Sequence, residues 1–184
     1  MRSRARGFES LSLRQIRPQF SRIAVLFFHY FSLPMKNYLE KYMLSKETIF
    51  VHYGDAAFDI EKFENIQNCD CLPKPINGGL WASPENSKNG WQKINNIRPQ
   101  DRSFFKFKLT DTAKILMLNC KDTIDKLPKI PSKIERFPII LDFEKLSLEY
   151  DVIFYKICSE MDILLPCWDC DCILVMNPNV ICPL

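Results

Sequence analysis

The residues best suited to chemistry lie around a glycine-rich stretch at 74–84, with the sequence KPINGGLWASP. Gly78 and Gly79 allow the backbone positive φ angles or a close approach to a ligand. The strand-like residues that follow carry the aromatic face of Trp81 and the hydroxyl of Ser83, and flanking prolines keep both sides out of helix. The stretch predicts a platform for a flat, polar ligand. The alternative is a tight turn whose Trp81 belongs to the core, since Gly pairs usually mark turns.

His52 is the only histidine after residue 34, and it lies in a β-branched and aromatic run, 48–53, that stops at Gly54. Such a run predicts a strand followed by a turn. At the rim of a sheet a histidine can bind a ribose hydroxyl or act as an acid or base. The alternative is a structural or exposed histidine. Serine catalysis is not indicated, because Ser83 has no nucleophile-elbow context, and no standard Gly-rich phosphate loop is present.

The eight cysteines favour free thiols over a secreted disulfide framework, because the chain is large and has no convincing signal peptide. Their positions are Cys69, Cys71, Cys120, Cys158, Cys167, Cys170, Cys172 and Cys182. A zinc site can be drawn from Cys69, Cys71, Cys167 and Cys170. The two Cys-Asp-Cys segments have one intervening residue, however, which is shorter than the usual zinc-ligand spacing. We therefore expect no metal site.

The 184 residues predict one domain with an ordinary globular composition, 47% hydrophobic and 26% charged. Residues 1–34 hold six of the nine Arg, one acidic residue and no Lys. The remaining 35–184 hold 19 basic and 21 acidic side chains, a net charge of −2. A domain this close to neutrality gives no electrostatic indication of nucleic-acid binding.

The N-terminal segment 1–34 resembles an out-of-place translation of a transfer-RNA gene, because RGFESLSLR at 6–14 contains the Gly-Phe-Glu-Ser that the T-arm encodes in one frame. We therefore predict a spurious or disordered extension over 1–34 and a single domain over 35–184. Two alternatives remain. The segment is Arg- and Ser-rich and acid-poor, as transit peptides are. Residues 23–33 are apolar, as in a signal peptide, but too few to span a bilayer.

Short helices and non-repeating strands alternate along the rest of the chain. Periodicity and composition predict helices over 37–44, 87–97, 123–127 and 142–150, and a short helical or irregular connection over 60–66. They predict strands over 48–53, 80–82, 103–109, 113–118, 151–157 and 172–176, and a proline-marked loop over 128–138. This mixture predicts an α+β fold, a split or curved mixed β-sheet with short flanking helices.

Three of these segments, in the order found here, resemble the ADP-ribosyltransferase fold. FVHYG at 50–54 is similar to the family's first strand, which ends in a polar residue before Gly. GLWAS at 79–83 is similar to its Gly, aromatic and Ser/Thr strand, and DCDCILVMNPNVI at 169–181 to its final acidic residue and apolar strand. The resemblance covers 48–181. It departs from the family in that Tyr53 separates His52 from Gly54, which turns the His52 side chain to the opposite side of the strand.

The resemblance implies that NAD binds as a substrate between two half-sheets. It implies that His52 or Tyr53 holds the adenosine ribose, that Ser83 steadies the site and that Trp81 stacks on nicotinamide. Asp171, or Asp169, would hydrogen-bond the nicotinamide ribose and stabilise its developing positive charge. The implied cofactor-binding set is His52, Tyr53, Gly54, Gly79, Trp81 and Ser83, and the implied catalytic set is Asp171, Asp169 and His52.

We therefore expect an NAD-dependent ADP-ribosyltransferase that modifies an unidentified protein or nucleic-acid acceptor. We also expect a cytoplasmic monomer of bacterial or phage origin that does not bind membranes. One alternative is a non-enzymatic nucleotide- or protein-binding domain of the same fold that has lost the acidic residue. A Cys-rich metal-binding protein is the other.

Overall fold

The computed structural model describes residues 44, 47–157, 165 and 167–184, and all but the first of these lie in one compact unit, Ser45–Leu184. The segment 1–34, the expected helix over 37–44 apart from its last residue, and Cys158 lie outside the described residues. Within the described part, no helix is long and apolar enough to cross a membrane.

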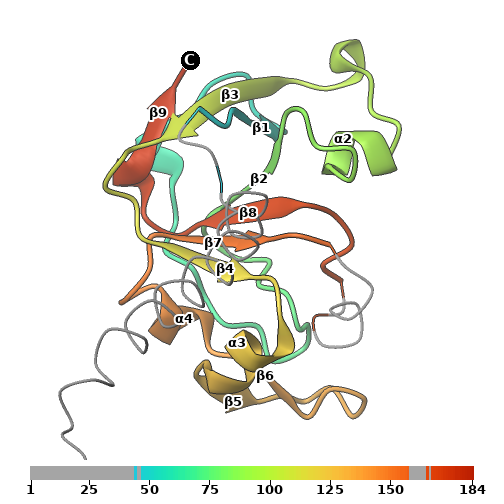
Figure 1. The fold of residues 1–184 in the computed structure, drawn as a ribbon, viewed down its shortest axis with the longest axis vertical. Coiled ribbons are helices and arrows are strands. Elements are labelled where there is room, and N and C mark those ends of the chain that lie inside the picture. Colours follow the sequence, from blue (N-terminus) through green and yellow to red (C-terminus); the bar gives the residue numbers. More distant parts are fainter. Residues whose placement is uncertain (1–43, 45–46, 158–164, 166) are drawn as a thin grey trace, which may run out of the picture. The chain divides into compact units, whose positions relative to one another are not determined.

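Seven strands of the described chain form one mixed sheet in the order β4-β7-β8-β2-β1-β3-β9 (Figure 1). β4 and β7 run parallel, whereas the other neighbours run antiparallel. β5 and β6 form a separate two-stranded sheet. The expected α+β class is confirmed. The strands are β1 (Phe50–Tyr53), β2 (Leu80–Pro84), β3 (Phe104–Leu109), β4 (Ile115–Leu118), β5 (Lys129–Pro131), β6 (Ile139–Leu141), β7 (Val152–Tyr155), β8 (Cys172–Val175) and β9 (Ile181–Pro183).

The most apolar runs of the sequence become neighbouring strands of the large sheet. Every residue of β7 and β8 is buried, as expected for strands covered on both faces. Leu174 and Ile153 belong to a cluster that also contains Trp168, whose ring stacks on Phe143 at a centroid distance of 6.2 Å. Trp81 of β2 packs against this cluster and β2 pairs with β8, so the glycine-rich stretch leads into a strand at the core.

Strand register decides which predicted site residues share a face of the sheet. Val51 lies opposite Ser83 in the β1–β2 pair, and His52 lies opposite Phe105 in the β1–β3 pair. Successive residues of a strand point to opposite faces, whereas directly opposed residues of neighbouring strands share one. One face, here called the Trp81 face, therefore carries Val51, Tyr53, Trp81 and Ser83, and the other, the His52 face, carries Phe50, His52 and Phe105.

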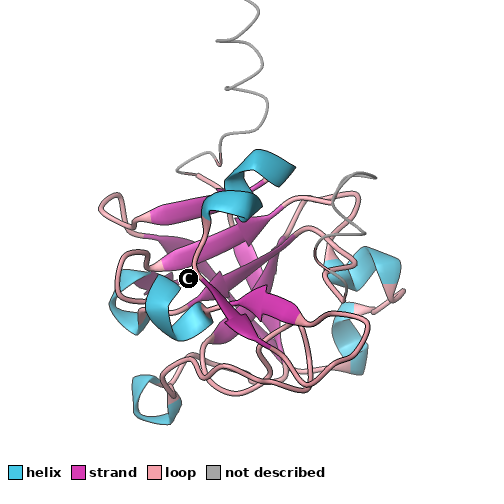
Figure 2. Cartoon of the chain, turned by 90° about the horizontal axis from the view of Figure 1, so that it is seen from below, coloured by secondary structure: helices cyan, strands magenta, loops and turns pink. Residues whose placement is uncertain are grey.

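The helices are short and lie around the sheet (Figure 2). α4 begins where the Asp142 carboxylate accepts a hydrogen bond from the Lys145 N–H at 3.0 Å, an ordinary N-cap. The described helices are α2 (Trp91–Ile94), α3 (Lys121–Lys126) and α4 (Phe143–Leu146), with 3₁₀ turns η1 (Ile60–Lys62), η2 (Pro99–Asp101) and η3 (Pro178–Val180).

Several sequence predictions differ from the structure, some through local geometry and some through strand pairing, and the helix expected over 142–150 forms only as α4. The helix expected over 87–97 forms only as α2, because Asn96 adopts a φ of 52° and ends it. The loop expected over 128–138 contains β5, which pairs with β6. The strand β9 was not expected. It pairs with β3 at the sheet's edge, where the missing N–H of Pro183 is tolerated.

Candidate functional site

A pocket on the Trp81 face brings together three residues of the expected cofactor-binding set, Tyr53, Trp81 and Ser83. Its volume is about 190 Å³. We call it the indole pocket, after its two tryptophan side chains. Its lining residues are Val51, Tyr53, Lys74, Trp81, Ala82, Ser83, Trp91, Cys170 and Cys172.

The aromatic rings of this pocket are held by specific contacts. The Trp81 indole N–H donates to the Pro75 carbonyl at 3.3 Å, and its ring meets Trp168 edge-on at 4.9 Å between centroids. The Tyr53 and Trp91 rings lie 5.5 Å apart and are tilted by 42°. These separations are in the range of favourable aromatic pairs. The rings therefore form a pre-positioned surface for another flat ring.

Each indole of the pocket also carries a cation. Lys74 Nζ lies 4.2 Å from the centre of the Trp81 ring, and the Arg102 guanidinium carbon lies 5.5 Å from that of Trp91. Both separations are within the range of cation–π attraction. An anionic group on a ligand stacked here would therefore meet Lys74, which lines the pocket, whereas Arg102 contacts Trp91 from outside the lining.

Ser83 has a structural partner within the pocket. Its hydroxyl oxygen accepts the Trp91 N–H at 3.0 Å, which satisfies one of the first free N–H groups of α2. Only 2% of the residue is exposed. Burial, followed by the negative charge of Glu85, raises the pKa of the neighbouring Tyr53 phenol, which therefore stays a neutral hydrogen-bonding group. Ser83 positions Trp91, and Tyr53 offers the polar hydroxyl.

Two buried thiols complete the wall of the indole pocket. The Cys172 thiol donates a hydrogen bond that lowers the pKa of Cys170, and Lys74 and Ser83 lower it further against the opposing effects of burial and Asp169. The same hydrogen bond, reinforced by burial, raises the pKa of Cys172 well above its ordinary value. The pair therefore gives up a first proton more readily than a second.

Asp171, the expected catalytic carboxylate, holds together three chain segments. Its carboxylate oxygens accept the Ser87 hydroxyl at 2.5 Å and the Ile157 N–H at 2.9 Å, and its own N–H donates to the Asn89 carbonyl at 2.8 Å. The residue is 6% exposed and does not line the indole pocket. Asp169, by contrast, is exposed.

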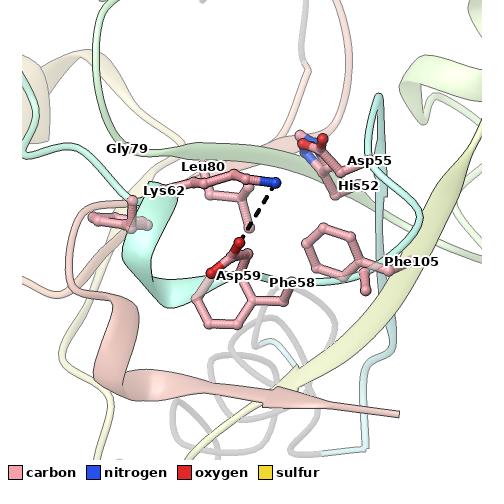
Figure 3. Close-up of a pocket in the computed structure, with 10 residues that line it drawn as sticks. His52, Asp55, Phe58, Asp59, Lys62, Gly79, Leu80 and Phe105 are labelled. Atoms are coloured by element: carbon pink, nitrogen blue, oxygen red, sulfur yellow. Dashed lines mark ion pairs between the residues drawn. The ribbon is translucent and has the colours of Figure 1, made fainter.

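His52 lies in a different pocket of about 190 Å³, on the His52 face (Figure 3). Its Nδ1 donates to the Trp81 carbonyl at 2.7 Å, and its Nε2 lies 3.4 Å from an Asp55 carboxylate oxygen. The Phe58 and Phe105 rings form the apolar wall of this pocket in Figure 3. The sheet therefore separates the His52 imidazole from the indole pocket, and His52 reaches Trp81 through a hydrogen bond from its side chain to the Trp81 main-chain carbonyl.

The two glycines of the 74–84 stretch adopt φ angles of +71° and +68°. A Cβ on Gly78 would lie 2.0 Å from the Asn65 carbonyl oxygen, and one on Gly79 would lie 2.8 Å from Leu174 Cδ1. The close approach that these glycines allow is thus to the protein's own chain. Gly79 also lines the His52 pocket, and Gly54 ends β1 with its N–H donating to the Ser103 carbonyl at 2.9 Å.

Of the site residues expected from the sequence, some line the indole pocket (Tyr53, Trp81, Ser83), some line the other pocket (His52, Gly79), and the rest line neither (Gly54, Asp169, Asp171). Sequence reasoning did not assign Lys74, Trp91 or Arg102 to a site. Lys74 stands at the start of the glycine-rich stretch, which was the available signal. The cation over Trp91 arises from tertiary contact between α2 and the segment before β3, for which no short motif exists.

No three His, Cys, Asp or Glu side chains of the described residues lie together as a metal site would require. The four-cysteine zinc site that can be drawn from the sequence is therefore not assembled in this part of the protein. Comparison of the chain with protein-family models, curated proteins and solved structures finds no match.

Proposed function

We propose that the indole pocket binds a nucleotide, with the base or another flat ring among the aromatic side chains and the phosphate outside against the cations. The observation that carries this proposal is that both pocket indoles have a cation over the ring: Lys74, which lines the pocket, over Trp81, and Arg102, from outside the lining, over Trp91. Aromatic rings suit any flat base, and the combination of stacking surfaces with positive side chains is how proteins hold nucleotides without a sequence motif.

The size of the pocket limits which part of the ligand enters it. Sites for drug-sized ligands are about 300–1,000 Å³, whereas the indole pocket is about 190 Å³. One ring system fits, and the sugar and phosphate must remain at the mouth. Lys74 lies over the Trp81 ring. A stacked base would take its place, and the ammonium group would then pair with the phosphate.

Binding is tested by titrating the full chain with AMP, nicotinamide mononucleotide, NAD and ADP-ribose, using quenching of tryptophan fluorescence and calorimetry. We expect Lys74→Gln to weaken binding about tenfold, equivalent to ~1.4 kcal/mol, because it removes a charge-assisted contact to phosphate. Lys121→Gln, on α3 and outside the pocket lining, is the matched control. Failure of all four ligands to bind at millimolar concentration, or equal affinities of the two variants, would refute nucleotide binding here.

Transfer of ADP-ribose from NAD, on an ADP-ribosyltransferase-like fold, is our second candidate. It is favoured by the exposed carboxylate of Asp169, which is close enough to Cys170 to raise the pKa of that pocket thiol. Asp169 suits the role better than Asp171, whose two oxygens already accept hydrogen bonds. In the reaction the glycosidic bond to nicotinamide breaks, the acceptor takes the ADP-ribose and its proton passes to solvent.

Release of nicotinamide from NAD, with water or lysate protein as acceptor, separates the two candidates. A transferase releases nicotinamide, and Asp169→Asn abolishes the release while leaving NAD binding intact. A binding domain releases none at any protein concentration. Asp122→Asn, on α3 and outside the pocket lining, is the matched control.

A further inference from the structure

Two thiols on the loop before β2 lie almost within bonding distance. The sulfur atoms of Cys69 and Cys71 are 3.1 Å apart. A disulfide bond is about 2.05 Å long, so the pair needs to close by only roughly 1 Å. Cys71 is exposed and Cys69 is partly exposed, so small molecules reach both.

The chain on which this pair lies is anchored at the residue between the two cysteines. The Asp70 carbonyl accepts the Lys133 N–H at 2.9 Å and the Ser132 hydroxyl at 3.1 Å. Its carboxylate pairs with the Lys133 ammonium at 2.5 Å. Just before the pair, the Asn68 amide donates to Asp142 at 2.8 Å and its oxygen accepts the Phe143 N–H at 2.7 Å. The thiols are therefore held close together and face solvent.

The two sulfur atoms are chemically unequal. A hydrogen bond from the Cys71 thiol, followed by the N–H groups of Cys71 and Leu72, lowers the pKa of Cys69. The same thiol contact raises the pKa of Cys71. A thiolate is the attacking species in disulfide exchange, whereas a protonated thiol is inert. Cys69 is therefore equipped to attack first, with Cys71 beside it as the second thiol.

We propose that Cys69 and Cys71 form a reversible dithiol–disulfide couple that exchanges with small-molecule disulfides of the glutathione class. The Cys69 thiolate attacks one sulfur of the oxidised disulfide, forms a mixed disulfide and releases one reduced thiol. Cys71 then loses its proton to water and attacks the Cys69 sulfur, which closes the protein disulfide and releases the second reduced thiol. The small disulfide gains two electrons and the two cysteines lose them, so the exchange is balanced.

The second step is favoured by the first. Once Cys69 carries the mixed disulfide it no longer holds a negative charge, so the contact that raised the pKa of Cys71 is removed. Two sulfur ligands are too few for a four-coordinate zinc site, and no third ligand from the described residues joins them. Redox exchange is therefore the chemistry that fits the pair as it stands.

Mass spectrometry of the full chain after a pulse of oxidised glutathione tests the proposal. Cleavage after Lys and Arg, but not before Pro, gives a peptide of 63–88 that contains these two cysteines and no other. We expect this peptide to lose two hydrogen atoms without retaining glutathione, and to regain them with a reducing agent. In Cys71→Ser it should stop at the mixed disulfide.

Exposed thiols elsewhere supply the controls. In Cys69→Ser, modification of the peptide should slow to the rate seen at Cys120, an exposed thiol whose sulfur contacts the Thr123 hydroxyl at 3.1 Å. Cys120→Ser should leave the reaction of 63–88 unchanged. The proposal is overturned if wild-type 63–88 retains glutathione, or if its cysteines react no faster than Cys120. Neither result depends on whether the indole pocket binds a nucleotide.

Discussion

The tripeptide Cys-Asp-Cys occurs twice in this chain, and its two copies lie in opposite surroundings. Cys69-Asp70-Cys71 is on an exposed loop, where the aspartate pairs with Lys133, whose side chain is 81% exposed. Cys170-Asp171-Cys172 leads into the central strand β8, and its three residues are 2%, 6% and 3% exposed. In each copy one thiol lowers the pKa of the other.

The difference shows that the role of each residue is determined by its burial and not by the motif. Asp70 in the loop carries a charge that water screens, whereas Asp171 at β8 is a buried acceptor of two hydrogen bonds. The thiols of the loop copy are accessible to small disulfides, whereas the thiols of the β8 copy form part of the wall of the indole pocket. The consequences of substitution should therefore differ between equivalent positions of the two copies.

Replacing the aspartates gives the largest expected contrast. Asp171→Ala leaves the partly buried Ser87 hydroxyl and Ile157 N–H without their acceptor, and an unsatisfied group costs about 1–3 kcal/mol where it is shielded from water. We expect the free energy of unfolding to fall by ~3 kcal/mol in urea titrations. Asp70→Ala should unfold near the wild-type urea concentration, because its carbonyl hydrogen bonds survive and its ion pair is screened by water. Equal losses in the two variants would contradict the contrast.

The sequence predicts the central part of the fold because its strands are continuous apolar or alternating runs. β3, β7 and β8 lie within the segments expected from composition alone. β5, β6 and β9 were not predicted, because each is only three residues long, so pairing with another strand rather than local preference makes them strands.

The candidate site was predicted only in part. Tyr53, Trp81 and Ser83 line one pocket, but the alternation of side chains along β1 sends His52 to the other face. The alternation of side chains along a strand is enough to predict that His52 and Tyr53 lie on opposite faces. The hydrogen bonds of Asp171 could not be predicted in this way, because its partners lie 84 and 14 residues away in the chain.

The two thiol pairs should also differ in how the free energy of unfolding depends on pH. We expect this difference to be smaller than the one between the aspartate variants. In the folded protein the pKa of Cys172 is raised. Its contribution to the free energy of unfolding is therefore fully present below the ordinary thiol pKa and is lost as the pH rises above it. The lowered pKa of Cys170 acts in the opposite sense, and its contribution appears as the pH rises towards the ordinary value. The folded state should therefore be favoured most near the ordinary thiol pKa of 9.0.

This effect is measured by urea titrations from pH 7 up to the highest pH at which unfolding is reversible. The measured quantity is the free energy of unfolding of the wild type minus that of Cys172→Ala. That difference should shrink as the pH rises above the ordinary thiol pKa. The equivalent difference for Cys71→Ala should change less, because water screens the loop pair. A larger pH dependence for the loop variant would reverse the assignment of the buried and exposed pairs.

The smallest expected effect is on thiol reactivity and concerns the carboxylates beside each pair. Asp70 raises the pKa of Cys69, so Asp70→Asn should increase the thiolate fraction at neutral pH and also free the Lys133 cation beside it. We expect iodoacetamide to modify the peptide 63–88 about twofold faster, a modest gain because water and salt weaken interactions between exposed charges. Asp169→Asn makes the equivalent change beside Cys170, where burial rather than ionisation limits the reaction, so its rate should stay unchanged. A faster modification of Cys170 with no change at Cys69 would contradict this expectation. It would mean that iodoacetamide reaches Cys170 through the indole pocket more readily than it reaches the loop.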